Sequence, residues 1–220
     1  MKITIPVISI FQRRQLTGLG AILMACVITG CSDPSDQVTK APTTAAKDAA
    51  KPAAGKTYAI LPDSTIGFVG SKVTGSHNGG FKKFTGKVNV ADGAVTAAEV
   101  KIDMDSTWAD NERLTGHLKS PDFFDTAKYP TATFTTTDIK STSEKKTVTG
   151  NLDLHGVTKS ITFPADIQVA GDAVAVKAEF AINRKDFNIN YPGKTDDLIR
   201  DNVILKLDIK ATPGELQAGK

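Results

Sequence analysis

Ser120, His117 and Asp122 lie close together in the chain and are the residue types of a hydrolytic triad. Residues so near one another in sequence rarely reach triad geometry. The chain also lacks the Gly-x-Ser-x-Gly elbow that presents a nucleophilic serine. Its glycines stand at expected hairpin turns, where a positive φ explains them, and they form no phosphate-binding loop. We therefore expect no catalytic residues and a protein that is not an enzyme.

The three histidines are His77, His117 and His155, and no two of them form a His-x-His or His-x-x-x-His pair. A metal site would have to assemble from distant segments, so histidines on the surface or in loops are the simpler interpretation. Both cysteines, Cys26 and Cys31, lie near the N-terminus, which leaves the rest of the chain without thiolate ligands. The sequence predicts neither a metal ion nor a cofactor.

The N-terminal segment has the composition of an export signal. Lys2, Arg13 and Arg14 precede the run LTGLGAILMACVITG, which is apolar but too short and too rich in small residues for a membrane-spanning helix. The run leads into Ile-Thr-Gly-Cys, which resembles the lipobox of bacterial lipoproteins, where cleavage precedes the cysteine and its thiol carries lipid. An ordinary secretory signal would instead leave Cys31 as a free thiol. We expect residues 1–30 to be a lipoprotein signal peptide and Cys31 to be the lipid attachment site.

A lipid on Cys31 would anchor the protein to a membrane of the bacterial cell envelope. Ser32 rather than an aspartate follows the cysteine, and by resemblance to lipoprotein sorting this favours the outer membrane, facing the periplasm. Residues 31–56 are rich in Ala, Lys, Thr and Pro without apolar periodicity, so we expect a disordered tether after the lipidated cysteine. A flexible coil of about 25 residues would reach roughly 25 to 30 Å from the membrane surface.

Alternation of apolar and polar residues dominates the chain after Tyr58, as in DNVILKLDIKA, where Val203, Leu205, Leu207 and Ile209 take every second position. This pattern predicts β-strands with one face in water. Counting that stretch, the sequence predicts about eight strands. The others occur at residues 64–73, 81–90, 94–106, 132–139, 146–154, 159–169 and 173–183.

Turn sequences separate the expected strands. They are Asn78-Gly79-Gly80, Asp92-Gly93, His155-Gly156 and Gly171-Asp172. Short connections join neighbouring antiparallel strands, which can form a sandwich or a closed barrel, and closure removes both edges. Strands of about ten residues, or roughly 33 Å, favour the barrel. We predict an all-β, eight-stranded antiparallel barrel at residues 57–212, followed by a C-terminal tail at 213–220.

One segment departs from this alternation. Leucines at positions i and i+4 of ADNERLTGHLK, residues 109–119, predict one short helix with Asp110 as its N-cap. The next residues place Phe123 and Phe124 between two prolines. We expect the helix and this loop to cover one end of the barrel, with the two phenylalanines either filling the core or lining a mouth.

Three sequence motifs occur in an order that is typical of one protein family. They are RLTGHLKSPDFFDTAKYPTATF at residues 113–134, GNLDLHGVTKSITF at 150–163, and INRKDFNI followed by DNVILKLDIKA at 182–189 and 201–211. These motifs resemble the YceI-like family, a lipocalin-like, polyisoprenoid-binding domain of bacterial envelopes. The sequence departs from the family pattern at Leu61-Pro62-Asp63 and at Asn188, where the family often has Ile-Asp-Pro and glycine.

The resemblance implies a long apolar tunnel that takes an isoprenoid chain, such as a quinone tail or a polyprenol. Spacing alone leaves open whether an eight-stranded barrel holds one ligand or is filled by its own side chains. A filled barrel would indicate a structural or protein-interaction lipoprotein instead. The candidate ligand-binding residues, on the strands and the cover, are Phe68, Leu114, Leu118, Phe123, Phe124, Phe134, Leu152, Leu154, Phe163, Phe180, Ile182 and Phe187.

The distribution of charge bears on whether the protein binds nucleic acid. The chain has 27 basic and 24 acidic residues, a formal net charge of +3, and its lysines are scattered without a basic run or interleaved aromatic residues. This pattern does not favour nucleic-acid binding. The expected partners are therefore a long-chain isoprenoid or other lipid and the membrane, with a homodimer left open.

Overall fold

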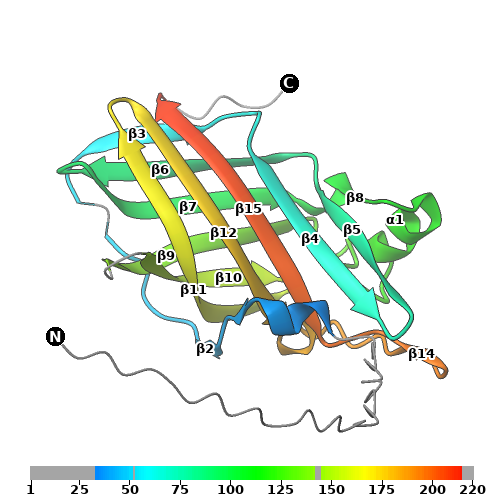
Figure 1. The fold of residues 1–220 in the computed structure, drawn as a ribbon. Coiled ribbons are helices and arrows are strands. Elements are labelled where there is room, and N and C mark those ends of the chain that lie inside the picture. Colours follow the sequence, from blue (N-terminus) through cyan, green and yellow to red (C-terminus); the bar gives the residue numbers. More distant parts are fainter. Residues whose placement is uncertain (1–32, 52, 142–144, 215–220) are drawn as a thin grey trace, which may run out of the picture. The chain divides into compact units, whose positions relative to one another are not determined.

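The computed structural model describes residues 33–51, 53–141 and 145–214. Eight strands form a closed antiparallel barrel in which strands adjacent in sequence are adjacent in the wall, and β15 closes the ring by pairing with β3 and β12 (Figure 1). The wall strands are β3 (Lys56–Ile60), β6 (Phe84–Ala91), β7 (Ala94–Asp103), β9 (Thr131–Ser141), β10 (Lys146–Leu154), β11 (Val157–Ala170), β12 (Ala173–Asn183) and β15 (Asn202–Pro213). The predicted eight-stranded barrel is confirmed.

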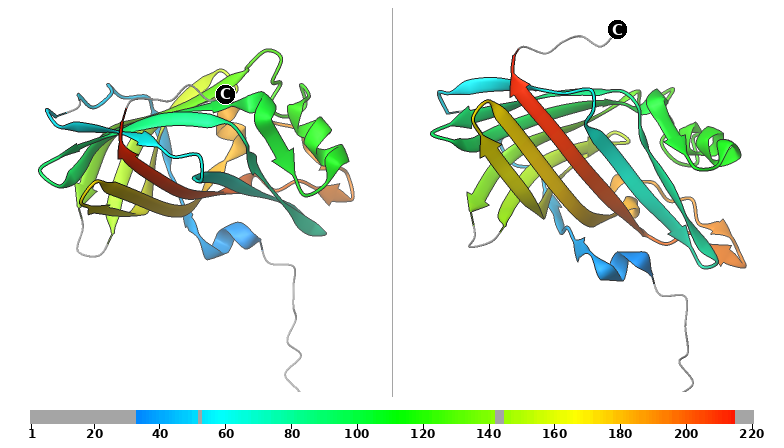
Figure 2. Two further views of the ribbon diagram at one scale, coloured as in Figure 1. Left: turned by 90° about the horizontal axis from the view of Figure 1, so that it is seen from above. Right: turned by 45° about the horizontal axis from the view of Figure 1, so that its top comes forward.

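Three further strands extend one side of the barrel: β4 (Thr65–Lys72), β5 (Gly75–Phe81) and β8 (Thr107–Ala109). β4 pairs with the first half of β15, and β5 lies between β4 and β8 (Figure 2). The turn expected at Asn78-Gly79-Gly80 is wrong, because these residues lie inside β5. Glycine serves close packing there, since a Cβ on Gly79 would lie 2.3 Å from the Phe68 ring.

The other three predicted turns are confirmed. Asp92 and Gly93 between β6 and β7 have φ angles of 52° and 72°, and His155 and Gly156 between β10 and β11 have φ angles of 54° and 73°. Two consecutive residues with positive φ are typical of the two-residue hairpin turns that match the twist of antiparallel strands. Gly171, with φ of 57°, turns the chain from β11 into β12.

The predicted helix is present as α1 (Glu112–Lys119). Its N-cap is Asn111, whose side chain accepts a hydrogen bond from the backbone N–H of Leu114 at 3.0 Å, so the predicted Asp110 cap is wrong by one residue. The Asp110 carboxylate instead accepts a hydrogen bond from the backbone N–H of Asn78 at 2.7 Å. Within the described ranges, no helix is long and apolar enough to cross a membrane.

The prediction of a disordered tether is wrong for residues 33–51. This segment contains η1 (Pro34–Gln37), β1 (Thr39–Lys40) and β2 (Thr43–Ala45). β1 pairs in parallel with β12, and β2 pairs antiparallel with β11. Composition did not indicate this order, because strand pairing uses backbone groups that every residue type carries, whereas low apolar content reports only on side chains. The signal segment, Cys31 and residues 215–220 lie outside the described residues.

Apolar side chains inside the barrel form two clusters. The larger cluster occupies the middle of the barrel and the end beside α1. The smaller cluster closes the opposite end, where the hydroxyl of Tyr58 donates to the carbonyl of Gly171 at 3.4 Å. The remaining short elements are η2 (Met104–Ser106), η3 (Arg184–Phe187), β13 (Gly193–Lys194) and β14 (Asp197–Leu198).

Candidate functional site

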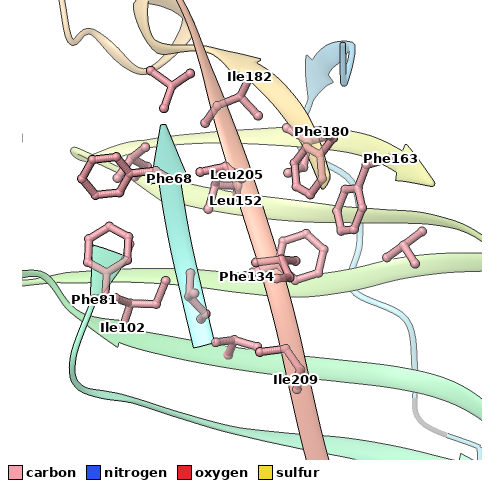
Figure 3. Close-up of a pocket in the computed structure, with 18 of the residues that line it drawn as sticks. Phe68, Phe81, Ile102, Phe134, Leu152, Phe163, Phe180, Ile182, Leu205 and Ile209 are labelled. Atoms are coloured by element: carbon pink, nitrogen blue, oxygen red, sulfur yellow. The ribbon is translucent and has the colours of Figure 1, made fainter. Parts of the chain in front are cut away.

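A cavity of about 230 Å³ lies inside the barrel, and its wall is almost entirely apolar. The strand period of two builds this wall, because every second side chain points inward. On β15, Leu205, Leu207 and Ile209 line the cavity, whereas the alternate residues Lys206 and Asp208 form ion pairs with β12 outside the barrel. Figure 3 shows side chains from several strands facing this shared space.

Most of the predicted ligand-binding side chains face this cavity. Those that line it are Phe68, Leu118, Phe123, Phe124, Phe134, Leu152, Leu154, Phe163, Phe180 and Ile182. The other two candidates do not line the cavity. Leu114 on α1 is half-buried and packs against the core cluster, and Phe187 in η3 is a fully buried member of that cluster. Sequence reasoning missed further wall residues, among them Ile66, Phe81 and Met104.

The two adjacent phenylalanines cover the end of the cavity beside α1. The Phe124 ring packs against Phe68 and Phe81, with ring centroids 6.3 and 6.0 Å apart. The Phe123 ring packs instead against His117, with centroids 5.0 Å apart, and is 7% exposed. Each phenylalanine therefore joins a different aromatic group while both line the cavity, so the loop is a cover built from core side chains.

Aromatic rings also form part of the side wall. Phe134 on β9 packs against Phe163 on β11, with ring centroids 5.7 Å apart. Phe163 in turn stacks on Phe180 of β12, with centroids 4.0 Å apart and ring planes 9° from parallel. A row of flat rings of this kind suits contact with an extended apolar chain, because it offers large apolar area at low cost in side-chain entropy.

Among the described residues that line the cavity, Arg184 alone is charged. Its side chain is 4% exposed and donates three hydrogen bonds to backbone carbonyls: Nη1 to Ile189 at 2.6 Å, Nε to Arg200 at 3.0 Å and Nη2 to Ile199 at 3.3 Å. The Asp201 carboxylate lies 3.7 Å from Nη2. Arg184 therefore holds the segment between η3 and β15 against the end of the barrel.

Burial lowers the pKa of the Arg184 guanidinium, and the nearby Asp201 carboxylate opposes this shift. Arginine stays protonated in proteins even so, because its ordinary pKa lies far above neutral pH. Sequence reasoning missed this wall residue, since Arg184 begins η3, where the alternation used to identify the wall has ended, and its side chain is charged. The INRKDFNI motif was the available signal, but it indicated family membership and not a position.

Each of the three histidines has a different hydrogen-bond partner. The rings of His77 and His117 lie 2.8 Å from the carboxylates of Asp110 and Asp122. His155 Nδ1 lies 3.1 Å from the Phe187 carbonyl, which can only accept, so this nitrogen carries the proton. Across the described part of the chain, no group of three or more His, Cys, Asp or Glu side chains could hold a metal ion.

Ser120, His117 and Asp122 do not form a triad in the structure. The Ser120 hydroxyl donates to the backbone carbonyl of His117 at 2.8 Å, and the His117 ring faces Asp122 instead. A nucleophilic serine would need the histidine ring as its hydrogen-bond partner. These three residues instead fix the end of α1 to the loop that carries Phe123 and Phe124.

A closed up-and-down barrel around an apolar cavity is the architecture of barrel proteins that enclose a ligand, such as the lipocalins. The comparison with protein families gives a more specific result. The chain belongs to the YceI-like family, because the model of the YceI-like domain matches residues 58–211. The resemblance inferred from the three sequence motifs is therefore confirmed.

Individual proteins show the same relationship. A UPF0312 protein of Pseudomonas putida is 36% identical over 131 residues, which cover 56% of this chain and 68% of the relative. The protein YceI of Escherichia coli is 38% identical over 126 residues, or 54% of this chain and 64% of that protein. Both alignments support the family assignment.

Solved structures match the barrel. BcnA of Burkholderia cenocepacia aligns with a TM-score of 0.63 and 26% sequence identity, over 68% of this chain and 96% of BcnA. A polyisoprenoid binding domain from Saccharophagus degradans, implicated in plant cell wall breakdown, aligns with a TM-score of 0.59 over 71% of this chain and 98% of that domain. Its sequence identity of 21% makes this second likeness one of fold.

Proposed function

We propose that this protein binds or sequesters a long-chain lipid, with an isoprenoid as the ligand, inside its barrel and does so from a membrane anchor. The observation that carries the proposal is the apolar cavity, whose wall includes the stacked rings of Phe163 and Phe180. The likeness to the polyisoprenoid binding domain from Saccharophagus degradans supports an isoprenoid as the ligand class. A quinone tail and a polyprenol both have this chemistry.

The free energy of burial is sufficient for such a ligand. A chain that buries about 400 Å² of apolar surface gains roughly 10 kcal/mol at about 25 cal/mol per Å². Loss of translational and rotational freedom removes several kcal/mol of that gain. At the low end of that cost, about 4 kcal/mol, roughly 6 kcal/mol remains, which corresponds to a Kd of some tens of micromolar without any charged contact.

The cavity wall supports binding rather than catalysis. Its polar side chains in the described structure are Thr136 and Arg184, and both are already hydrogen-bonded to backbone groups. The Thr136 hydroxyl accepts from the N–H of Ala98 at 2.8 Å. Neither group is free to act as a nucleophile or a base on a ligand, so we assign no catalytic step to the cavity.

Extraction of the purified protein with organic solvent, followed by mass spectrometry, tests the function directly. We expect an isoprenoid in about one-to-one ratio with the barrel, and uptake of added ubiquinone or polyprenol by protein stripped of lipid. A lipid-free extract together with no uptake of either compound would contradict the proposal. That result would favour the alternative, a structural or protein-interaction lipoprotein whose barrel is filled by its own side chains.

We also propose that lipid on Cys31 anchors the protein to the outer membrane, facing the periplasm. The lipobox-like Ile-Thr-Gly-Cys sequence and Ser32 after it support this location. A single acyl chain binds only marginally, so stable anchoring needs the additional chains that a lipoprotein carries. In cell fractionation, a Cys31→Ala variant should lose its firm attachment to the membrane, and a variant that stayed in the membrane fraction would contradict the anchor.

A further inference from the structure

The pairing between β11 and β12 stops partway along the barrel. These strands pair from Ala170 and Ala173 beside their turn to Asp166 and Lys177. Beyond that point β11 still pairs with β10, and β12 still pairs with β15, but each has a second edge that faces the other across a gap in the ladder. This gap, between residues 157–165 and residues 178–183, is called the seam below.

The N-terminal segment occupies the seam. β1 pairs with the free edge of β12 at Phe180 and Ala181, and β2 pairs with the free edge of β11 from Lys159 to Ile161. Between these strands, the N–H of Ala41 donates to the carbonyl of Ala181 at 2.8 Å. Ala41 is 6% exposed and belongs to the main core cluster. Residues 33–50, called the strap below, therefore complete the barrel wall at this place.

The cavity lies directly behind the seam. Ile161 and Phe163 on β11, and Phe180 and Ile182 on β12, all line it. The Phe163 and Phe180 rings face each other across the seam in the stacked pair described above. The wall here consists of the strap and two rings, whereas continuous strand ladders form it on either side.

The strap is held by contacts that can be broken without opening the barrel ladders. Its N-terminal end is held by an ion pair between Asp33 and Arg200 at 3.7 Å, and Thr43 donates to Asp186 at 2.5 Å. Further along, the backbone of Lys47 exchanges two hydrogen bonds with the Asn151 side chain. If the strap lifted, every pair among the eight wall strands, including the one that closes the ring, would remain.

Two buried hydroxyls weaken the closed arrangement. The Oγ atoms of Ser35 in η1 and Ser160 opposite Thr44 are buried and have no hydrogen-bond partner. Each serine is 1% exposed. A buried polar group without a partner costs free energy that it recovers when water reaches it. Lifting the strap would hydrate the seam around Ser160, which lowers the cost of opening.

Both ends of the cavity are covered. Phe123 and Phe124 cover the end beside α1, and the cluster that includes Tyr58 and Val90 closes the other. The volume of about 230 Å³ is also below the roughly 300 to 1,000 Å³ typical of pockets for small organic ligands. A long chain therefore requires both an entrance and an expansion of the cavity, and separation at the seam supplies both.

We propose that the strap is a movable part of the barrel wall, and that the apolar chain of a membrane lipid enters sideways between β11 and β12 when the strap lifts. This inference rests on the proposed lipid-binding function. The expected anchor places the entrance close to its source of ligand, because only Ser32 separates Cys31 from Asp33 at the start of the strap. Lipid would then reach the seam directly from the membrane surface.

A disulfide between strap and wall tests the proposal. Thr44 and Ser160 are directly opposite in an antiparallel pair, where Cα atoms lie about 4.5 to 5.5 Å apart, within the range of a disulfide. Residues 33–220 contain no native cysteine and include both core clusters and the complete ring, so they can be produced as one folded unit.

The test variant is Thr44→Cys with Ser160→Cys. The matched control, Lys177→Cys with Asp208→Cys, joins β12 to β15, which stay paired in either state.

The readout is the rate at which each variant takes up ubiquinone from phosphatidylethanolamine vesicles. Oxidation of the strap variant should slow uptake by about tenfold or more, reversibly on reduction, whereas oxidation of the control should leave the rate unchanged. Equal rates for the oxidised and reduced strap variant, with uptake intact, would place the entrance elsewhere and overturn the inference. Failure of every reduced protein to take up ubiquinone would instead overturn the binding function on which it rests.

Hydrogen exchange gives a second test that needs neither a ligand nor a variant. The Ala41 N–H should exchange through a local opening, about a hundredfold or more faster than amides of the β12–β15 ladder such as that of Leu207. The same exchange rate for the strap and for that ladder would show that they open only together, which would overturn the movable strap.

Discussion

The rings of Phe163 and Phe180 stack face to face, with centroids 4.0 Å apart, across the line where β11 and β12 cease to pair. Their strands make no backbone hydrogen bonds to each other at these residues, so side-chain packing joins the two strands there. The strap lies on the outer side of the same line, with Thr39 beside Phe180. The ring pair therefore forms part of the cavity wall. It also joins β11 to β12 where their backbone pairing has ended.

Alanine substitutions should show this coupling. Phe180→Ala should lower the free energy of unfolding by about 3 to 5 kcal/mol, because the ring is 1% exposed and its loss leaves a cavity. In a double-mutant cycle with Phe163→Ala, the pair should show a coupling of about 0.5 to 1.5 kcal/mol, measured by urea denaturation.

A second cycle serves as the control. Phe81 lies in a different aromatic group, with Phe68 and Phe124, so Phe81→Ala should add to Phe180→Ala within about 0.5 kcal/mol. Additivity of the Phe163 and Phe180 substitutions as well would contradict a specific contact across the seam.

The barrel and most of its wall could be predicted from the sequence because alternation reports side-chain direction. On a strand with one face in water, the apolar set must point inward, and Phe134, Leu152 and Phe180 do so. The two ligand candidates that do not line the cavity, Leu114 and Phe187, belong to helical turns, where a period of two gives no direction. The inward direction of a side chain was therefore predicted most accurately for residues on strands.

The strap and Arg184 could not be predicted, for two different physical reasons. The strap pairs through its backbone with edges that exist only because β11 and β12 separate, and nothing local in residues 33–50 reports that separation. Arg184 is stabilised by carbonyls of three residues that follow it in the chain, so its burial depends on tertiary contacts. Patterns of residue type do not contain either kind of information.

The carboxylate of Asp110 should make the α1 side of the barrel sensitive to acid. The backbone N–H of Asn78, and then the His77 ring, hold the pKa of this carboxyl below its ordinary value of 3.8. A carboxyl whose pKa is lower in the folded state contributes stability that is present above the unfolded pKa and is lost as the pH falls through the folded pKa. The stability difference between wild type and Asp110→Asn should thus be constant above about pH 5 and decline below pH 3.8.

Thermal denaturation of both proteins from pH 6 to about pH 2.5 measures that difference. His77→Gln is the control, because it keeps the Asn78 N–H that is the main cause of the shift, so the acid dependence should persist in this variant. A difference that did not change with pH would show that the carboxylate contributes nothing through its charge.

Replacement of Arg184 should destabilise the end of the barrel beside η3. Arg184→Met leaves the carbonyls of Ile189, Ile199 and Arg200 without their donor, and the loss should be about 3 kcal/mol or more. Arg184→Lys should recover only a small part, because an ammonium group cannot reproduce the guanidinium fork. Urea denaturation measures both, and full stability of the lysine variant would show that charge alone is sufficient.

The matched control for Arg184 is its carboxylate neighbour. Asp201 is 44% exposed and lies 3.7 Å away, so Asp201→Asn should cost less than about 1 kcal/mol. A larger loss from Asp201→Asn than from Arg184→Met would mean that the ion pair, and not the bonds to carbonyls, fixes this segment.

Filling the cavity from Gly70 gives a test of where the ligand binds. Gly70 lines the cavity on the same face of β4 as Ile66 and Phe68, and a Cβ added there would meet no atom within 4 Å. A leucine at this position should occupy the space that an isoprenoid chain needs and reduce the amount of ubiquinone bound by about tenfold or more. The melting temperature of Gly70→Leu should not fall, since the new side chain buries apolar area and replaces a glycine within a strand.

Gly116→Leu is the matched control, because it adds the same side chain at an exposed position on α1 where a Cβ also meets nothing within 4 Å. Equal binding by the folded Gly70→Leu variant and by wild type would show that the ligand lies outside this cavity.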